Sequence, residues 1–530
     1  MTVPFTFATS TNPIPLSNLD ANFAAVGDST NITYTPPFTG GVAETLSAKL
    51  AQTISVQDFG AVGDGVTDDA SAIQNALNYA TTIFGTVILP AGTYRVSTGI
   101  TVPAGVILQG VGGNGWNGTQ IAGGSTILAD ASVAIVVTLN GGAASVSTGI
   151  NDVFIIRNVT LPSQIPSGSI GLKVISTDQA SINNVYSFCH AIGIYVNGQL
   201  GMNFYGCNTG SVTDTHVLIE NSYEVTFIEC RFGRNGGGDY SSNNYIRIKG
   251  TDDTISFVRC QLNQTGNTVT GPAVYFQSYA SPNGIVTFTT CHAESFASHF
   301  VYEDGVGSGV LRRLEIINST IYTSSDSTVF IQYAAGFLTE LNISSSSLVG
   351  AITLDQDFAW NICNNFIIGA VLINQGSGSF TGNSLYTGLT VQGVFTDSAV
   401  VSNNALITNT SYTNSATGAI TSTGNITSSS LVNSNIINKF NTGWLQLTDV
   451  PFAIKTYYGS LDASGNVLIS YSQSEGYILN VQGFYKGNSG EAKQLTFSYA
   501  DGNGIVLTGG IAHSHYRVTV IHTSTFDTNW

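Results

Sequence analysis

The alternation of apolar and polar positions repeats along most of this chain, between about residues 100 and 425. The repeated unit reads apolar, any, apolar, any, any, small or Cys, any, apolar, and its clearest copies are VTFIECRF at Val225, ISFVRCQL at Ile255, VTFTTCHA at Val286, LEIINSTI at Leu314 and LNISSSSL at Leu341. Copies recur at steps of 23 to 31 residues when their third positions, Phe204, Phe227, Phe257, Phe288, Ile316 and Ile343, are aligned. Such a unit buries one stripe of side chains, and its recurrence predicts a solenoid of stacked β-coils.

Cysteine occupies one fixed slot of this repeat. Cys207, Cys230, Cys260 and Cys291 all follow the third position of the unit by three residues. We expect them to form an inward stack of small, soft side chains in a reduced protein, because buried Cys behaves as a small hydrophobe. A metal or redox site is the alternative, but no CxxC pair or His-containing metal spacing accompanies the six Cys of the chain.

A second alternating strand precedes several copies of the repeat: HVLIEN, YIRIKG, AVYFQS and HFVYED. The inward residues are expected to be Val217, Ile219, Ile246, Ile248, Val274, Phe276, Phe300 and Tyr302. The outward row is then Leu218, Glu220, Arg247, Lys249, Tyr275, Gln277, Val301 and Glu303. This row is the richest polar and aromatic stripe of the repeat.

The stretch VQDFGAVGDGVTDDASAIQNAL, from Val56 to Leu77, interrupts the strand pattern. Its glycines and aspartates predict a turn, and the residues after it predict a short helix that Thr67 or Asp68 can cap. One helical face would hold Ile73, Ala76, Leu77 and Ala80. Because strands such as TVILPAGTYRV follow, we expect this helix to cover the open end of the solenoid.

The motif DFGAVGDGVTDD, followed by the AIQNAL helix and a VILPAGTY strand, resembles the start of the pectate-lyase-like right-handed parallel β-helix, as it occurs in bacteriophage tailspikes and capsule depolymerases. The resemblance implies an all-β fold, a homotrimer, and a role in host adsorption through recognition and cleavage of capsule or O-antigen. A non-catalytic glycan-binding receptor spike and a bacterial pectin-type lyase or hydrolase remain alternatives. The motifs that mark calcium-dependent pectate lyases and polygalacturonases are not recognisable, so no active residue can be carried over.

Three domains are expected. Residues 1–50 are irregular and rich in proline, which predicts a flexible leader. The tailspike resemblance implies the alternative, a segment that attaches to a phage tail or baseplate protein. Residues 51–430 form the β-helix with its capping helix. Residues 431–530 have longer alternating strands separated by turn signals, which predicts a C-terminal β-sandwich. The tailspike resemblance implies that this sandwich trimerises or binds carbohydrate.

The amino-acid composition limits which kinds of molecule the protein is expected to bind. The 16 Lys and Arg residues against 32 Asp and Glu give a formal charge of -16, which disfavours nucleic acid and repels acidic polysaccharide unless basic groups cluster locally. The chain begins without a basic segment and contains no long apolar run, so we expect synthesis in the host cytoplasm, a place in the virion and no membrane insertion. The absence of HExxH, P-loop and dinucleotide motifs predicts no metal and no cofactor.

Candidate chemistry gathers in the middle coils. Hydrolysis of a glycan needs two carboxylates, whereas elimination from a uronic acid needs a base and a group that stabilises the enolate; hydrolysis is slightly favoured here. We expect Glu294 and Glu303, within CHAESFASHFVYEDG, to be the acid/base pair, and Asp239, on the insertion GRNGGGDYSSNNY, to be the next catalytic candidate. The sugar-binding candidates are Arg231, Arg247, Tyr275 and His292. The alternative is that these groups only solubilise one face, and the groove could lie within one chain or between two.

Two further pairs of charged residues are expected to be structural. Glu229 and Arg259 occupy the same slot in successive coils, which predicts a ladder ion pair. Asp252 and Asp253 belong to a TDDT turn, where we expect both side chains to be solvated.

Overall fold

A computed structural model describes most of the chain up to residue 421 and seven strands after it. The described residues are 16–30, 32–112, 115–116, 121–142, 148–175, 180–198, 200–233, 241–263, 269–326, 328–392, 394–402, 404–406, 411–414 and 417–421, with strands between residues 452 and 523. The chain divides into two compact units, Met1–Gly350 and Ala351–Trp530.

Three parallel sheets make up the solenoid of the first unit. Sheet 1 contains β3 (Ile54–Ser55), β5 (Thr86–Ile88), β8 (Ile107–Gln109), β13 (Gly149–Asn151), β16 (Ser181–Asn183), β19 (Leu200–Tyr205), β22 (Tyr223–Ile228), β25 (Thr254–Val258), β28 (Gly284–Thr289), β31 (Leu311–Ile317) and β34 (Glu340–Ser344). Sheet 2 contains β4 (Asp64–Asp68), β6 (Gly92–Val96), β11 (Ser125–Ala129), β14 (Val153–Arg157), β17 (Tyr186–Phe188), β20 (Asn208–Gly210), β23 (Arg231–Phe232), β26 (Gln261–Leu262), β29 (His292–Ala293), β32 (Thr320–Tyr322) and β35 (Ser347–Val349). Sheet 3 contains β7 (Ile100–Pro103), β12 (Ile135–Asn140), β15 (Ile170–Ile175), β18 (Ile192–Asn197), β21 (Thr215–Glu220), β24 (Asn244–Gly250), β27 (Val274–Tyr279), β30 (Val301–Glu303) and β33 (Ile331–Gln332).

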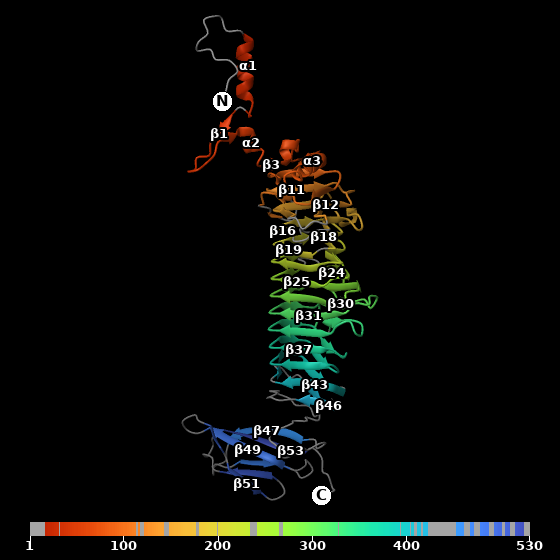
Figure 1. Cartoon of the computed structure of the whole chain (residues 1–530). Coiled ribbons are helices and arrows are strands. Elements are labelled where there is room, and N and C mark those ends of the chain that lie inside the picture. Colours follow the sequence, from red (N-terminus) through yellow and green to blue (C-terminus); the bar gives the residue numbers. More distant parts are fainter. Residues whose placement is uncertain are drawn as a thin grey trace. The chain divides into compact units, whose positions relative to one another are not determined.

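Each coil crosses sheets 1, 2 and 3 in turn, and each strand pairs with its equivalent in the next coil, as Figure 1 shows. The fold is the expected right-handed parallel β-helix. Short elements outside the coils are α1 (Leu16–Gly27), α2 (Leu46–Leu50), α3 (Ala70–Ala80), the 3-10 turns η1 (Val56–Phe59) and η2 (Pro162–Gln164), and the antiparallel pairs β1 (Thr33–Tyr34) with β2 (Glu44–Thr45) and β9 (Gly115–Trp116) with β10 (Ile121–Ala122).

Aligned side chains fill the interior. The rings of Phe204, Phe227, Phe257 and Phe288 stack in register, with successive centroids 4.4, 5.2 and 4.9 Å apart. The predicted inward stack of Cys207, Cys230, Cys260 and Cys291 is confirmed, since all four are buried and free of disulfides. Each thiol also lies against a backbone carbonyl oxygen of the preceding coil at 3.2 to 3.6 Å.

The residue before the Cys slot turns the chain from sheet 1 into sheet 2. In eight successive coils it has a left-handed backbone, the residues being Asp152, Asn184, Gly206, Glu229, Arg259, Thr290, Asn318 and Ser345. The predicted ladder pair is confirmed at this corner, because Arg259 Nη2 lies 2.9 Å from Glu229 Oε1.

Helix α3 covers one end of the solenoid (Figure 1). Its predicted apolar face, Ile73, Ala76, Leu77 and Ala80, is fully buried. The residue that directly precedes the helix is Asp69, whose carboxylate accepts from the backbone amides of Val62 and Gly63 at 2.7 and 3.0 Å. Of the two expected caps, Asp68 accepts from the backbone amide of Ala70, the first helical residue, at 3.3 Å. The acidic residues of the motif therefore stabilise the turn that they form. The motif accordingly indicates the fold and does not indicate a catalytic activity.

The second unit begins with shorter parallel coils. Their strands are β36 (Ile352–Leu354), β37 (Ala359–Cys363), β38 (Phe366–Ile368), β39 (Ala370–Ile373), β40 (Ser377–Thr381), β41 (Ser384–Leu385), β42 (Gly388–Val391), β43 (Val394–Ser402), β44 (Ala405–Leu406), β45 (Ser411–Asn414) and β46 (Thr417–Thr421). Buried Asn365, Asn383 and Asn404 hydrogen-bond to one another in consecutive coils, with amide nitrogens 3.0 Å from the next side-chain oxygen.

The strands described after residue 451 are antiparallel. One sheet contains β47 (Phe452–Ser460), β53 (His515–Thr523), β49 (Ile478–Lys486) and β50 (Ala492–Gln494), and the other contains β48 (Val467–Ser470), β52 (Gly504–Thr508) and β51 (Thr496–Ala500). Two antiparallel sheets agree with the alternation from which a sandwich was predicted. The domain boundaries and the role of this region stay predictions.

Candidate functional site

The predicted site residues divide between two sheets that meet at one corner of the coil. Arg231 and His292 lie on sheet 2, and Arg247 and Tyr275 lie on sheet 3. The chain passes from sheet 2 to sheet 3 through residues 234–240 in one coil and 264–268 in the next, and Asp239 lies in these segments, outside the described residues. The corner between sheets 2 and 3 therefore separates the two groups of candidates along the chain path.

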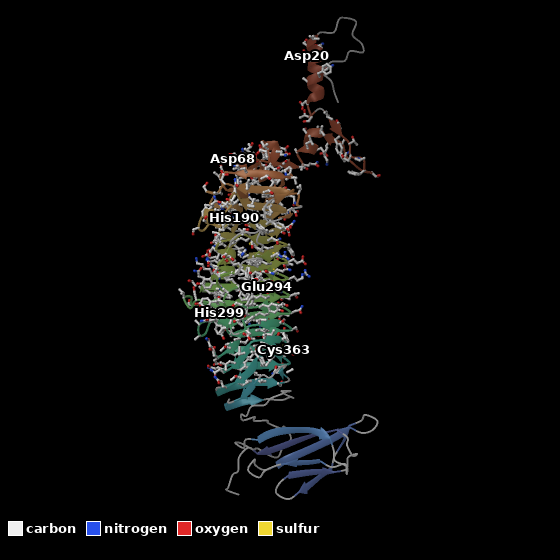
Figure 2. All side chains as sticks on the ribbon, turned by 180° about the vertical axis from the view of Figure 1, so that it is seen from behind. Asp20, Asp68, His190, Glu294, His299 and Cys363 are labelled. Carbon is white, nitrogen blue, oxygen red and sulfur yellow. The ribbon has the colours of Figure 1, made fainter. Side chains whose placement is uncertain are left out.

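On sheet 2, one carboxylate is surrounded by hydrogen-bonding groups. Glu294 follows β29, and its Oε1 accepts from the amide of Asn263 at 2.6 Å while His292 Nε2 lies 3.3 Å from its Oε2. Both the His292 and Glu294 side chains are about one third exposed, at 36% and 35%. In the same row of side chains, Arg231 Nε donates to Gln261 at 2.7 Å. Glu294, labelled in Figure 2, is thus a solvent-accessible carboxylate with an imidazole beside it.

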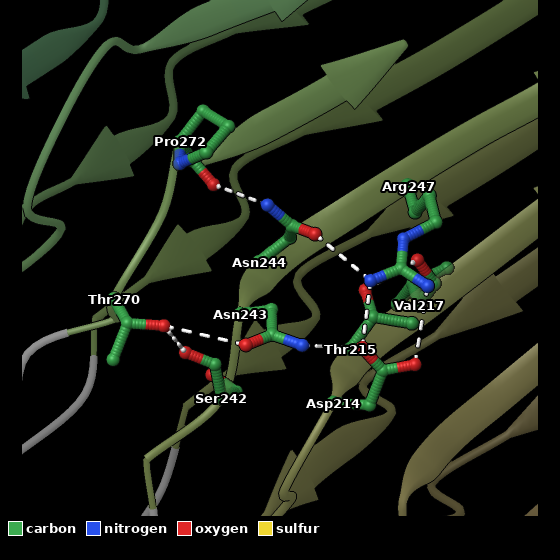
Figure 3. Close-up of polar contacts among 9 residues, drawn as sticks. All are labelled: Asp214, Thr215, Val217, Ser242, Asn243, Asn244, Arg247, Thr270 and Pro272. Carbon is green, nitrogen blue, oxygen red and sulfur yellow. Dashed lines mark hydrogen bonds and ion pairs between the residues drawn. The ribbon is translucent and has the colours of Figure 1, made fainter. Parts of the chain in front are cut away.

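On sheet 3, Arg247 is held by Asp214, which lies directly before β21. Its Nη1 and Nη2 donate to the two oxygens of Asp214 at 3.1 and 2.7 Å, and Nη2 also reaches Asn244 at 3.1 Å (Figure 3). The amide of Asn243 donates to the same carboxylate at 2.8 Å. Both Nη atoms of Arg247 are therefore already bonded to the Asp214 carboxylate. In this arrangement Arg247 and Asp214 form an ion pair without net charge, and the guanidinium is not free to bind a sugar carboxylate.

Aromatic rings continue this face toward the following coils. The guanidinium of Arg247 lies 5.9 Å from the centre of the Tyr275 ring, and the Tyr275 and Tyr302 rings are 5.8 Å apart. Tyr302 stacks in turn on His299. Burial, together with Asp304, which accepts from the phenol at 3.3 Å, raises the pKa of Tyr275, so its hydroxyl is a hydrogen-bond donor rather than a base.

A second polar cluster lies at the other end of the sheet 3 strands. Tyr195 donates to Glu220, which also forms an ion pair with Lys249 at 2.9 Å. Burial followed by the hydrogen bond to Glu220 raises the pKa of Tyr195 to about 12. Burial acts to raise the pKa of Glu220, but the bonds from Tyr195 and Lys249 outweigh it and leave the value lowered. Glu220 is consequently ionised, and Lys173 lies 5.4 Å from the Tyr195 ring.

The expected partnership of Glu294 and Glu303 does not form on one surface. Glu303 pairs in register with inward Phe276, is 6% exposed, and accepts from the backbone amides of Gly305 at 2.7 Å and Ala334 at 2.9 Å. The prediction that Glu303 points outward is therefore wrong. The predictions that Val301 points outward and Tyr302 points inward are wrong for the same reason. Glu303 fastens two loops from inside the solenoid.

Asp252 also differs from expectation. It is fully buried, accepts from the backbone amide of Ser222 at 2.7 Å, and has a second oxygen without a hydrogen-bond partner among the described residues. Burial chiefly raises the pKa of Asp252 to about 8, with a further contribution from the charge of Glu220. The prediction of a solvated turn residue is wrong for Asp252.

Sequence reasoning did not single out Asp214, Tyr195 or Tyr302. Asp214 lies one residue before the strand, where alternation no longer assigns a face. Tyr195 occupies the same outward register as Leu218, so extending the strand alignment by one coil to IGIYVN would have found it. In the part of the chain that the structure describes, no group of three or more His, Cys, Asp or Glu residues is placed to hold a metal ion, and no helix is long and apolar enough to cross a membrane.

Comparisons with known proteins agree with the fold. Residues 53–133 match the family described as rhamnogalacturonase A/epimerase, pectate lyase-like. Mannuronan C5-epimerase AlgE5 of Azotobacter vinelandii is 48% identical over 66 residues, 11% of this chain and 7% of that protein. The capsule K30/K69-specific depolymerase of Klebsiella phage K64-1 is 22% identical over 309 residues, 54% of this chain and 37% of that protein.

Among solved structures, a tailspike mutant of E. coli bacteriophage HK620 in complex with a hexasaccharide is similar over 95% of this chain and all of that chain. The TM-score is 0.51 at 13% sequence identity, so the likeness concerns the fold. This chain spans only a small part of the length of the curated relatives that it matches.

Proposed function

We propose that this chain is a bacteriophage tailspike that binds and depolymerises a bacterial surface polysaccharide, either capsule or O-antigen, during host adsorption. The proposal rests on sheets 2 and 3, which meet at one corner of the coil. Sheet 3 carries the ion-paired Arg247 and the rings of Tyr275 and Tyr302, and the partly exposed Glu294 follows a strand of sheet 2. Tyrosine faces pack on pyranose rings, and paired polar groups orient sugar hydroxyls. The Klebsiella phage relative carries the name of a depolymerase, which supports the same function.

Within this proposal, Glu294 transfers the proton during cleavage of the glycan, and His292 lies beside its carboxylate. Arg231, Arg247 and Tyr275 position the sugar. Asp214 and Glu220 lie at opposite ends of β21, six residues and so about 20 Å apart. Glycosidase carboxylates lie roughly 5 to 10 Å apart, so these two do not form a pair within one chain. Asp239, which lies outside the described residues, remains the proposed second carboxylate.

Product analysis tests the activity. The purified protein is incubated with capsule and O-antigen from candidate hosts, and the products are analysed by size and mass. Oligosaccharides carrying one added water indicate hydrolysis, whereas unsaturated products of lower mass indicate elimination. We expect oligosaccharides, with hydrolysis favoured.

The matched variants are Glu294→Gln and Glu229→Gln. Glu229 is exposed and ion-paired with Arg259 at the corner of sheets 1 and 2, and it has no role in the proposed site. Loss of a proton-transfer group lowers the rate roughly 10²- to 10⁴-fold, so E294Q should lose cleavage and keep glycan binding while E229Q keeps both. Full cleavage by E294Q would remove Glu294 from the mechanism.

A receptor spike that binds glycan without cutting it is the second candidate. It is favoured by one observation, the inward position of Glu303, which leaves Glu294 without its expected partner. Intact polymer together with measurable binding to a susceptible host would establish this function and exclude the depolymerase.

We also propose that the protein is a homotrimer of the virion tail and that residues 1–50 attach it to a tail or baseplate protein. Multi-angle light scattering should give three times the chain mass of 55.5 kDa. A monomer at micromolar concentration would contradict the trimer. Loss of attachment on deletion of residues 1–50, with glycan binding retained, would support the role of the leader.

A further inference from the structure

One arginine lies inside the solenoid without a counter-charge. Arg157 ends β14, pairs in register with inward Ala129, and is 1% exposed. Its Nη1 donates to the backbone carbonyl oxygens of Asp130 at 3.2 Å and Ala131 at 2.8 Å, where the chain turns from sheet 2 into sheet 3. Its Nε and Nη2 are buried and have no hydrogen-bond partner among the described residues. The residues of this corner, 129–135 and 157–170, are all described.

The surroundings supply no negative charge. Among the described residues no carboxylate forms an ion pair with Arg157, in contrast to Arg95, Arg247, Arg259 and Arg313. The titratable groups that interact electrostatically with Arg157 are Cys189 and His190, which lie in the next coil. Burial and then the charge of Arg157 lower the pKa of His190 to about 3, against a smaller contribution from the backbone of Ile155, so this imidazole is neutral.

Burial of a single uncompensated ion costs several kcal/mol, and each buried donor left without an acceptor adds to that cost. Burial lowers the pKa of Arg157, yet a guanidinium does not lose its proton in proteins. An enclosed water would offer an acceptor and no charge. An enclosed anion would satisfy Nε and Nη2 and neutralise the guanidinium together.

We propose that Arg157 binds a small monovalent inorganic anion, such as chloride, through Nε and Nη2 inside the solenoid. Arg157 itself is 1% exposed, so a bound anion at Nε and Nη2 would be closed off from solvent. The anion is therefore a structural component that enters during folding. His190, labelled in Figure 2, marks the position of this region along the chain fold.

The anion site is separate from the proposed glycan site. Strand β14 precedes β23, which carries Arg231, by three coils, or about 14 Å along the sheet. The inference does not depend on the proposed function, and loss of either leaves the other intact.

Long-wavelength anomalous diffraction from crystals of the protein purified in chloride gives the direct test. We expect an anomalous peak for chlorine within hydrogen-bond distance of Arg157 Nε and Nη2. Electron density without an anomalous signal would identify a water and overturn the proposal, as would chloride found only on the protein surface.

A solution measurement gives a second test. Thermal unfolding is compared in sodium chloride and in sodium gluconate at equal ionic strength, because an anion that binds only the folded state raises Tm as its concentration rises. The chloride-specific increase should disappear in Arg157→Met and persist in Arg259→Met, which removes an exposed, ion-paired arginine. An equal chloride response in all three proteins would overturn the proposal; if R157M does not fold, the diffraction result decides.

Discussion

Backbone strain at single residues is concentrated at the corner between sheets 1 and 2. The left-handed conformation that recurs there suits Gly and Asn, because a β-carbon crowds the following carbonyl oxygen. Thr290, with φ +56°, is the β-branched residue of this row in the first unit. The side chain of Asn318 donates to its hydroxyl at 3.3 Å, which is weak compensation.

Replacing Thr290 by Asn should therefore stabilise the fold by about 1 kcal/mol. The control is Thr287→Asn on the extended strand β28, where Asn is disfavoured and a small loss of stability is expected. Chemical denaturation of both variants measures the difference. If T290N is no more stable than T287N, left-handed strain is not the cause.

Glu303 is a residue whose chemistry is structural in this fold. Its two oxygens accept from the backbone amides of Gly305 and Ala334, so Glu303→Gln weakens two charge-assisted bonds and leaves a poorly placed amide. We expect a loss of about 1 to 3 kcal/mol in unfolding free energy, with cleavage or binding unchanged at temperatures where the variant is folded. Unchanged stability with lost cleavage would return Glu303 to the catalytic group.

At the scale of elements, the inward slot after the left-handed residue runs through successive coils as Cys207, Cys230, Cys260, Cys291, Ser319 and Ser346. Ser319 donates to the carbonyl oxygens of Phe288 at 3.3 Å and Ile317 at 2.9 Å. The thiol of Cys260 contacts the equivalent oxygens of Phe227 and Val258. One bonding pattern therefore serves both residue types.

Cys260→Ser should accordingly change stability by less than about 1 kcal/mol, while Cys260→Leu should cost about 1 to 3 kcal/mol because the packed column has no room for it. Thermal unfolding of the two variants tests this. Equal losses would mean that size does not limit the slot. In the folded protein, burial chiefly raises the pKa of Cys230, so its thiol should also resist alkylation at neutral pH.

Elements also explain which parts of the site the sequence could predict. Period-2 alternation assigned Arg247 and Tyr275 to the outer face correctly, because β24 and β27 are long. The alternation failed at β30, a strand of three residues that follows buried Phe300. An unbroken apolar run of this kind does not show which residues point inward and which point outward. Burial of an acid such as Glu303 leaves no mark in the local pattern, since its partners are backbone amides of other segments.

At the scale of the whole molecule, the repeat and the DFGAVGDG motif were sufficient to predict the solenoid, its stacked Cys and its capping helix. The pairing of Asp214 with Arg247 on sheet 3 was not predictable, because these residues are brought together by coil register rather than by spacing in the chain. The burial of His190 and His216 was likewise not predictable from the sequence.

Those histidines predict acid sensitivity. Burial lowers the pKa of His216 to about 3, below its ordinary value of 6.5, so the folded state favours the neutral ring. Its contribution to stability is complete above pH 6.5 and is lost progressively as the pH falls toward 3, by roughly 1 kcal/mol per pH unit. Unfolding free energy measured between pH 7 and 4 should fall less steeply for His216→Gln than for the wild type.

The slope, and not the absolute stability, is the quantity compared, since H216Q also removes a contact with Thr209 at 3.0 Å. Thr209→Val, which removes the same contact and keeps the His216 ring, should keep the wild-type slope. Identical slopes in all three proteins would show that His216 does not bind protons differently in the two states.

The insertion between β23 and β24 has both of its ends fixed by neighbouring coils. Gly233 donates its backbone N–H to Thr209 at 3.0 Å, and Asn243 donates to Asp214 at 2.6 Å. Because the anchors are independent of what lies between them, a loop of another length or sequence can replace residues 234–240 at an entropic cost of about 0.6 kcal/mol per doubling of length. Under the proposed function, a replacement segment that keeps an acidic residue in the position of Asp239 would alter which polysaccharide is bound, while the coils on either side stay unchanged.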